Sequence, residues 1–371
     1  MDLNTLQKSI YEMNEEEIFY KKYREAEKSK ESLHAFLSQI DKEEVYKKHR
    51  LILEWPDTIP LGRKYDDTFF FDMNDTNAIL VQRHNRYSPP LMHSHTFFEL
   101  IYVYDGTCVQ KLNHTENLLH TGDVCIIPPG VLHAIDVNDS SVILNVLIRK
   151  DTLHNIFFNF LSTQNILSSF FLNNIYGQSI NSYIIFHTGQ DYEIRRGFLY
   201  MYWESLNKSM YYYQMIGNTL TLCFGLLIRN YSHFVETPSP ARRNEEQSDK
   251  LLQYIQANYA TVTAEETARV FSYSREYVSR LIKEATGLSF TGFVQKVRME
   301  KAQDLLRNTN MTVAEIAEQV GYSSPEHFIR LFRRFSKMTP TGYRHSQSDN
   351  KEKVIIARLQ KNPVHDWTFM N

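Results

Sequence analysis

A pattern that occurs twice in the last third of the chain constrains its fold more than any other feature. Each copy contains a small residue, a tight turn, a serine and then a segment with one apolar face and one basic face. The copies cover residues 267–283 and 316–333, and they are offset by 49 residues before the turn and by 50 after it. A unit used twice at a fixed spacing indicates a repeated supersecondary structure. We therefore predict two helix-turn-helix units.

The residues at the turns and helix starts support this prediction. A small side chain lets two helices approach closely, glycine accepts a positive φ, serine caps a helix N-terminus, and proline suits the first helical position. The residues concerned are Ala268, Ala317, Gly321, Ser274, Ser324 and Pro325. Apolar residues at helical spacing over 290–306 predict a connecting helix of about 17 residues, about 25 Å long. Such a helix would hold the two units about one turn of DNA apart, near 34 Å.

The charge is distributed unevenly along the chain. The net charge of −2 argues against a nucleic-acid binder only if charge is spread evenly. Residues 250–344 carry 14 Lys and Arg against 9 Asp and Glu, whereas the remainder carries 27 against 34. The near-neutral total therefore hides a basic helical region attached to an acidic body.

Composition and length exclude several classes of protein. With 42% hydrophobic and 23% charged residues in 371, the chain has enough apolar material for more than one core and is not predominantly disordered. The 3 cysteines and 13 glycines exclude disulfide-scaffold and collagen-like classes. No secretory signal opens the chain. The most apolar run, residues 220–228, is far shorter than the about 20 residues of a membrane span, so no membrane association is expected.

We predict an α+β multidomain protein, with a β-barrel followed by an all-α region. Short apolar runs separated by turn residues indicate the barrel; the expected strands are Thr68–Phe71, Ala78–Val81, Phe98–Tyr104, Val109–Leu112, Val124–Ile127 and Val142–Ile148. The domains expected are 1–64, a helical extension; 65–150, the barrel; 151–235, helices; 236–249, a linker; 250–345, the double helix-turn-helix; and 346–371, a tail.

The repeat region resembles the DNA-binding domain of the AraC/XylS family of bacterial transcription regulators. The matching residues are Ala268, 279–281, 286–287, Arg298, Ala302, 305–306, 316–317, 320–322, Phe328, Arg330, Phe332, Pro340 and 343–344. Ser272 and Lys337 depart from the family, which usually has glycine at both positions. The resemblance implies a cytoplasmic regulator, more often an activator, that binds double-stranded DNA and acts with RNA polymerase.

The resemblance also assigns roles within each second helix. Base contacts fall on Glu276, Ser279, Arg280, Pro325, Glu326 and Arg330. Phosphate contacts fall on Ser274, Arg275, Lys283, Arg333 and Arg334. Arginine is the common reader of guanine, and glutamate can accept from cytosine N4. Phosphate contacts position the protein without specifying sequence.

A second set of residues lies in the β-region. His93 and His95 alternate on one expected strand and so share a face, Glu99 lies four residues further, and His133 follows a later turn. Together with Gly106, Gly122 and 128–130 they resemble the two motifs of the cupin superfamily, although Val137 stands where that family has asparagine. Three imidazoles and a carboxylate could hold a divalent first-row metal. The alternative, which we favour, is that they line a pocket for a small effector and that no cofactor is required.

These observations predict a ligand-responsive DNA-binding regulator, not an enzyme. An effector in the barrel would change the placement of the DNA-binding domains through the linker. A metal-dependent cupin enzyme, of dioxygenase or isomerase type, with an attached DNA-binding module is the alternative. A third hypothesis is that residues 1–54 bind a partner protein. Helices expected over 192–209 and 214–231 are predicted to pair two subunits, although their apolar residues could instead form the back wall of the barrel.

Overall fold

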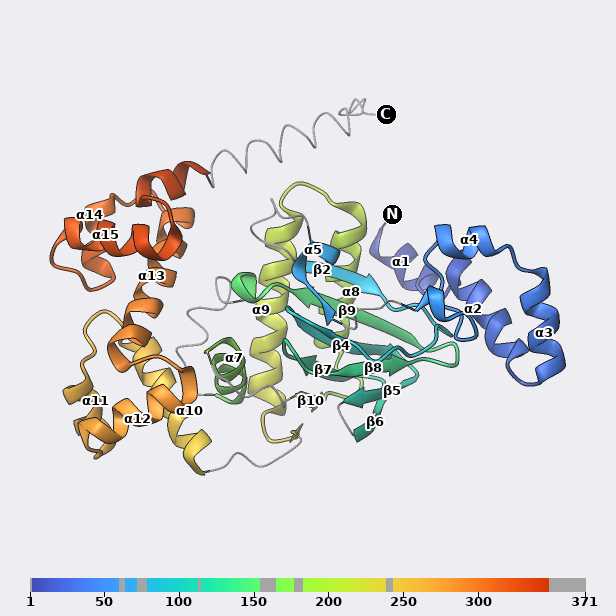
Figure 1. Ribbon diagram of the computed structural model, residues 1–371, viewed down its shortest axis with the longest axis horizontal. Coiled ribbons are helices and arrows are strands. Elements are labelled where there is room, and N and C mark those ends of the chain that lie inside the picture. Colours follow the sequence, from blue (N-terminus) through green and yellow to red (C-terminus); the bar gives the residue numbers. More distant parts are fainter. Residues whose placement is uncertain are drawn as a thin grey trace.

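The computed structural model describes residues 2–59, 64–71, 79–112, 115–153, 165–176, 183–237 and 243–346. A β-rich body with flanking helices is followed by a helical C-terminal region at one end of the molecule (Figure 1). The predicted fold class is confirmed. The predicted tail and the ends of several predicted domains lie outside the described residues.

Two sheets face each other in the β-rich body. The strands are β1 (Lys64–Tyr65), β2 (Ile79–Arg83), β3 (Ser94–His95), β4 (Phe98–Asp105), β5 (Thr107–Leu112), β6 (Thr115–His120), β7 (Asp123–Ile127), β8 (His133–Asp136), β9 (Val142–Ile148), β10 (Ile184–His187) and β11 (Val235–Glu236). The larger sheet has the order β11-β10-β7-β4-β9-β2 and the smaller has the order β6-β5-β8, with β1 paired to β3 apart from both. The strands that the structure describes thus form open sheets instead of one closed ring of hydrogen bonds.

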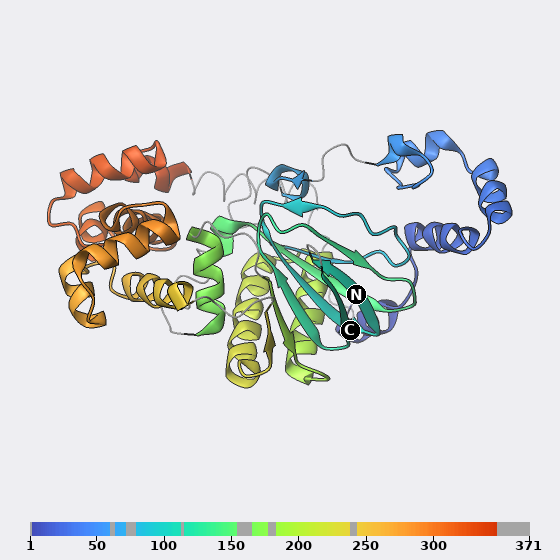
Figure 2. The ribbon, with the colours of Figure 1, turned by 60° about the horizontal axis from the view of Figure 1, so that its bottom comes forward.

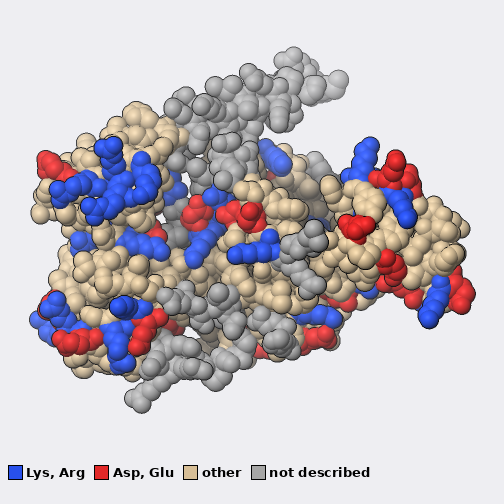
Figure 3. Space-filling model, in the orientation of Figure 1, with Lys and Arg blue, Asp and Glu red and all other residues tan. Residues whose placement is uncertain are grey.

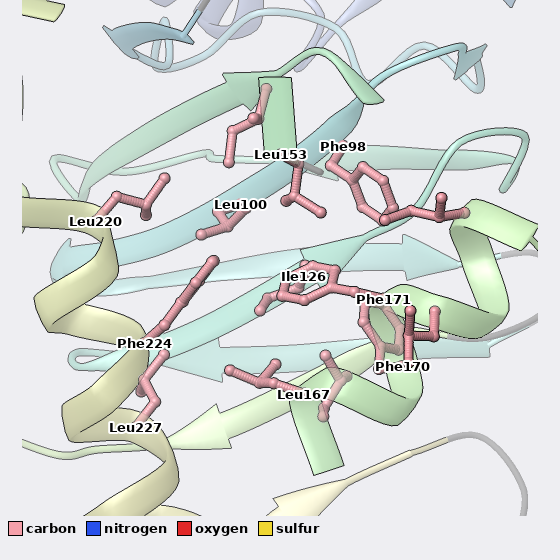
Figure 4. Close-up of a cluster of buried hydrophobic side chains, with 14 of the residues drawn as sticks. Phe98, Leu100, Ile126, Leu153, Leu167, Phe170, Phe171, Leu220, Phe224 and Leu227 are labelled. Carbon is pink, nitrogen blue, oxygen red and sulfur yellow. The ribbon is translucent and has the colours of Figure 1, made fainter. Parts of the chain in front are cut away.

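Alternation along β4 explains the two cores. Ile101 and Val103 point to the smaller sheet, while Phe98, Leu100 and Tyr102 point to the helices on the other face. All five are at most 1% exposed. Figure 4 shows the helical side, where Leu220 and Phe224 of α9 and Phe171 of α7 meet the sheet. The larger sheet is therefore the middle layer of the body.

Among the described residues, three helices cover this outer face of the larger sheet. They are α7 (Ile166–Tyr176), α8 (Tyr192–Asn207) and α9 (Tyr212–Tyr231). The two helices predicted over 192–209 and 214–231 therefore exist, close to their predicted ends. Most of the apolar residues proposed there for pairing subunits face the sheet, as the back-wall alternative had it: Leu199, Leu220, Phe224 and Leu227 are buried, and Trp203 and Ile228 pack against the same core.

The N-terminal extension is helical and docked on the β-rich body. It contains α1 (Leu3–Ser9), α2 (Glu15–Ala26), α3 (Lys30–Gln39) and α4 (Lys42–Lys47), followed by the 3-10 turn Pro56–Thr58. Leu6 and Ile10 belong to the main core. The Glu17 carboxylate is fully buried and accepts hydrogen bonds from Arg83 and Arg86. Apolar packing and a buried ion pair thus hold the extension in place.

The C-terminal region contains the predicted pair of helix-turn-helix units. Its helices are α10 (Arg243–Ala257), α11 (Ala264–Phe271), α12 (Arg275–Thr286), α13 (Phe290–Asn308), α14 (Val313–Gln319) and α15 (Pro325–Ser336). We call α11–α12 the first reader and α14–α15 the second reader. The turn residue Ser272 and the C-cap Lys337 take φ of 55° and 61°. Both therefore adopt the left-handed conformation for which the family usually has glycine.

Two sequence predictions need correction. Thr68–Phe71, predicted as a strand, lies largely in the helix α5 (Asp67–Phe70), because the Asp66 side chain caps its N-terminus by accepting from Thr68 N. The linker predicted over 236–249 is interrupted by structure at both ends: Glu236 belongs to β11, and α10 begins at Arg243. In the described part of the chain, no helix is long and apolar enough to cross a membrane.

Candidate DNA-binding surface and effector pocket

The second helix of the first reader presents its predicted base-contact residues to solvent. The Ser274 hydroxyl accepts a hydrogen bond from Tyr277 N at 3.1 Å and so caps α12. Glu276 and Arg280 are exposed and Ser279 is half-buried. They lie on the helix face opposite the buried core residues, which leaves their side chains able to enter a groove.

The second reader repeats this arrangement. Ser324 caps α15 and Pro325 occupies its first turn, as predicted. Ser324 Oγ also donates to Glu326 Oε2 at 2.9 Å. The pKa of Glu326 is lowered, first by its own backbone N–H and then by Ser324, so this carboxylate stays available as an acceptor. The exposed Arg330 guanidinium donates to His327 Nδ1 at 2.8 Å. His327 was not among the predicted residues, because its side chain comes next to that of Arg330 only on a formed helix.

The predicted phosphate contacts are exposed around these helices. Arg275 forms an ion pair with Glu265 at 3.0 Å, and Lys283, Arg333 and Arg334 are exposed. Exposed ion pairs contribute little to stability, so a phosphate can replace the carboxylate at small cost. Figure 3 shows Lys and Arg gathered over the part of the molecule that holds α14 and α15. This face has the charge that a DNA backbone requires.

Arg298 fixes the second reader to the connecting helix. Its guanidinium donates to the carbonyl oxygens of Tyr259, Ala260 and Gly321 at 2.7, 3.0 and 3.1 Å. Arg298 lies on α13, while Gly321 forms the turn between α14 and α15. One side chain therefore ties the loop after α10 and the turn of the second reader to the same helix.

A cavity of about 240 Å³ opens between the sheets and the segment that follows the N-terminal helices. Its apolar wall consists of Leu51, Tyr65, Phe69, Phe70, Pro89, Leu91, Phe97, Ile135 and Leu147. Its polar wall consists of Gln82, His84, Ser88, His93, His95, Glu99, His133 and Asn145. The four predicted pocket residues, His93, His95, Glu99 and His133, thus line one cavity together.

The buried Glu99 carboxylate is the centre of the polar wall. Glu99 Oε2 lies 3.2 Å from His95 Nε2 and 3.0 Å from His133 Nε2, and Asn145 Nδ2 donates to Glu99 Oε1 at 2.7 Å. The His93 ring lies 4.3 Å from the His133 ring, centroid to centroid. Asn145 and His84 were not predicted, because strand pairing, not a local motif, brings β9 and the end of β2 to this site.

Charge at this centre is set by burial and hydrogen bonds. Burial raises the pKa of Glu99, but the hydrogen bonds from His133 and His95 outweigh it, so the pKa lies well below its ordinary value. Burial, with repulsion from His133, lowers the pKa of His93 to about 4. Burial also lowers the pKa of His95. The site therefore holds a carboxylate next to two imidazoles, those of His93 and His95, whose pKa values are lowered.

The donor set fits a divalent metal at three of the four predicted positions. Ligand atoms of His93, Glu99 and His133 lie within 4.8 Å of one another. His93 Nδ1 donates to Leu91 O at 2.8 Å, and His133 Nδ1 donates to Val131 O at 3.0 Å. Such bonds to carbonyls typically fix the tautomer of a metal-binding histidine.

Two segments of the chain match models of known protein families. Residues 79–164 match the family model of the AraC-like ligand binding domain, and residues 267–346 match that of a helix-turn-helix domain. The two occur in the order that the sequence predicted. The chain thus combines the ligand-binding and helix-turn-helix domains of AraC-type transcription regulators.

Several named regulators are similar to this chain. It is 26% identical over 253 residues to the HTH-type transcriptional activator RhaS of Enterobacter sp. (strain 638), covering 67% of this chain and 85% of the relative. The C-terminal domain of AraT, a response regulator from Geobacillus stearothermophilus, is 36% identical, with a TM-score of 0.27, over 28% of this chain and 88% of that one. ToxT of Vibrio cholerae is 12% identical, with a TM-score of 0.32, over 74% and 99%.

Proposed function

We propose that this regulator reads promoter DNA with α12 and α15 and responds to a small molecule bound in the cavity between its sheets. The observation that carries the proposal is the pair of capped helices with exposed polar and basic faces, joined by α13. We assign base contacts to the predicted residues Glu276, Ser279, Arg280, Pro325, Glu326 and Arg330, and phosphate contacts to Ser274, Arg275, Lys283, Arg333 and Arg334. Since bacterial DNA lies in the cytoplasm, the protein would act there, together with RNA polymerase.

Binding to promoter DNA, measured by fluorescence anisotropy over a series of salt concentrations, tests the first half of this proposal. We expect specific binding that weakens steeply with salt, because each phosphate contact releases a counterion. If the purified protein prefers no fragment from the region upstream of its own gene, even at low salt and with cell extract added, the proposal fails.

The cavity indicates the chemistry of the effector. Asn145 Oδ1 and His84 Nε2 are buried and find no hydrogen-bond partner among the described residues. Asn145 Nδ2 already donates to Glu99 Oε1, so the group of Asn145 left for a ligand is its carbonyl oxygen. A carbonyl oxygen accepts hydrogen bonds, so the ligand must donate. Aromatic rings, including those of Tyr65 and Phe97, form much of the remaining wall. These features favour a small ligand that offers hydroxyl or amine donors on one side and an apolar face on the other.

Whether the site also holds a metal separates the regulator from the enzyme alternative. His93, Glu99 and His133 would hold the ion, and it would supply a fixed positive charge or a Lewis acid. We propose that the protein is not an enzyme and that these residues serve effector binding without a required cofactor. Metal analysis of freshly purified protein checks this. Stoichiometric iron or manganese that is lost in His93→Ala would favour the cupin enzyme instead.

We further propose a homodimer. The α8–α9 pair leaves several large apolar side chains in solvent: Leu206, Met210, Tyr211, Met215 and Leu222 are 48, 81, 67, 40 and 60% exposed. A second copy of the same helices would cover them symmetrically. Two DNA-binding domains would then face the operator together.

A further inference from the structure

The helix α7 lies between the β-rich body and the DNA-binding domain (Figure 2). On the side of the sheet, the Phe171 ring lies edge-on to Phe98 of β4, with centroids 5.4 Å apart, and 5.4 Å from Phe224 of α9. On the other side α7 packs against α10 and α12. We call the β-rich body, with the helices that cover its larger sheet, the sensor. The short helix α7 therefore touches both the outer face of this larger sheet and α12, the second helix of the first reader.

Tyr176, the C-terminal residue of α7, contacts the connecting helix α13. The Tyr176 side chain is buried, and its ring meets Phe293 edge-on at 5.0 Å. Its hydroxyl donates to Glu300 Oε2 at 2.5 Å, while Lys296 Nζ lies 4.7 Å from the ring centroid. These three partners lie along one face of the helix that sets the spacing of the two readers.

A second polar contact holds the same two parts together. Gln253 Nε2 of α10 donates to Ser169 Oγ of α7 at 2.6 Å. Gln253 is 4% exposed, so this bond is made in a largely water-free interface. Buried residues of α10 and α13 also belong to the same apolar cluster as the sensor core. The DNA-binding domain is thus docked on the sensor through both polar and apolar contacts.

The pocket and this interface are one strand apart. Glu99, at the centre of the cavity, follows Phe98 directly on β4, and neighbouring residues on a strand point to opposite faces. A ligand that moves Glu99 therefore acts on the strand whose other face carries the Phe98–Phe171 contact. β4 and α7 therefore connect the cavity to the first reader through direct contacts.

We propose that α7 is an intramolecular latch: through Tyr176 and Ser169 it holds the DNA-binding domain docked on the sensor in a state of low DNA affinity. Docking pins α12 to a helix of the sensor, so α12 cannot adjust freely to the groove. The rest of the chain, with 34 acidic against 27 basic residues, carries a net negative charge that repels DNA phosphates. This inference rests on the proposed function and adds its control element.

A cysteine pair across the latch tests it in the full-length protein. In Ser169→Cys/Gln253→Cys, oxidation to a disulfide locks the docked state, and reduction releases it. The native Cys108, Cys125 and Cys223 are buried, so they stay silent. We expect the oxidised protein to bind promoter DNA about tenfold more weakly than the reduced one, the factor corresponding to about 1.4 kcal/mol. Ser169→Cys alone is the matched control and should not respond to oxidation.

A conservative substitution gives an independent readout. Tyr176→Phe removes only the hydroxyl that donates to Glu300, and it should raise DNA affinity and accelerate amide exchange in α10 and α13. Tyr231→Phe is the control, because its hydroxyl donates to Asp191 within the sensor. If the pair fails to cross-link without DNA, or if locked, released and Tyr176→Phe proteins bind DNA equally, the latch is wrong. If none of the proteins, wild type included, binds promoter DNA, the proposed function itself fails.

Discussion

The buried carboxylate of Glu17 leads to a clear prediction about the stability of the protein. It is fully buried, and Arg83 and Arg86 donate to it at 2.9 Å. Glu17→Gln leaves two arginines without their counter-charge, so we expect the free energy of unfolding to fall by about 3 kcal/mol. Urea denaturation followed by tryptophan fluorescence measures this. The exposed Glu25→Gln serves as a control and should change stability by less than about 0.5 kcal/mol.

The same carboxylate predicts a pH dependence. Burial would raise the pKa of Glu17, but hydrogen bonds from Arg86 and from Asn14 N and the charge of Arg83 outweigh it, so the pKa is lowered. A lowered pKa in the folded state means that the stabilisation is complete above the unfolded value, about 4.3, and is lost as the pH falls through the folded value. The stability difference between wild type and Glu17→Gln should therefore shrink below about pH 4. A difference that is constant from pH 7 to pH 3 would contradict this.

Gly321 is required by both conformation and space. It has φ of +87°, and a Cβ there would lie 2.1 Å from Ala260 O, the carbonyl that also binds Arg298. Gly321→Ala should destabilise the protein by about 2 kcal/mol or more. Gly189→Ala is the matched control, since Gly189 also has positive φ but open space around it. It should cost about 1 kcal/mol, the strain alone. Thermal unfolding of the two variants compares them.

At the scale of elements, α15 carries two kinds of proposed DNA contact: Arg330 to bases and Arg333 to phosphates. Arg330→Ala should relax the preference for one base pair by about 1–3 kcal/mol, because it removes a proposed base contact. Arg333→Ala should instead weaken binding to every sequence alike and reduce the salt slope by about 1. Binding to a randomised operator library, with a salt titration of each variant, distinguishes the two outcomes. Equal loss of specificity in both variants would show that the assignment of α15 is wrong.

The elements also show what the sequence could predict. The two readers were predictable because their sequence signals are local. Ser274 and Ser324 each cap a helix by accepting from the backbone N–H three residues later, and the repeat shows which residues of the two units correspond. The run Thr68–Phe71 misled, because its aromatic residues favour a strand while the preceding Asp66 caps a helix. The pocket was only half predictable. His93, His95 and Glu99 lie within one short segment, but Asn145 reaches Glu99 through the pairing of β4 with β9.

The packing of α7 between sensor and reader had no sequence signal at all. Its partners Phe98, Phe224, Phe293 and Glu300 are distributed over more than half of the chain. An apolar residue such as Phe171 indicates that a segment is buried, but it does not indicate which surface covers it. Interfaces of this kind follow from the assembled shape, which is why the sequence predicted a linker between the domains but not their docking.

At the scale of the whole molecule, the exposed apolar residues of α8 and α9 predict an assembly. Leu222→Asp places a charge in the proposed contact between copies and should convert the dimer to a monomer in analytical ultracentrifugation. Leu118→Asp, at a residue that is 56% exposed on the β6 hairpin, is the control and should leave the mass unchanged. A monomeric wild-type protein at micromolar concentration would count against pairing through these helices.

The two readers differ in how they are built into the molecule. Leu281 of the first reader and Phe293 of the connecting helix α13 belong to the same core as the sensor. Met299, further along α13, instead forms a separate cluster with Ile316 and Phe328 of the second reader. Changes in the second reader can therefore accumulate without disturbing the sensor. Over evolutionary time such a protein can acquire new target promoters through α15 while the signal it answers stays the same.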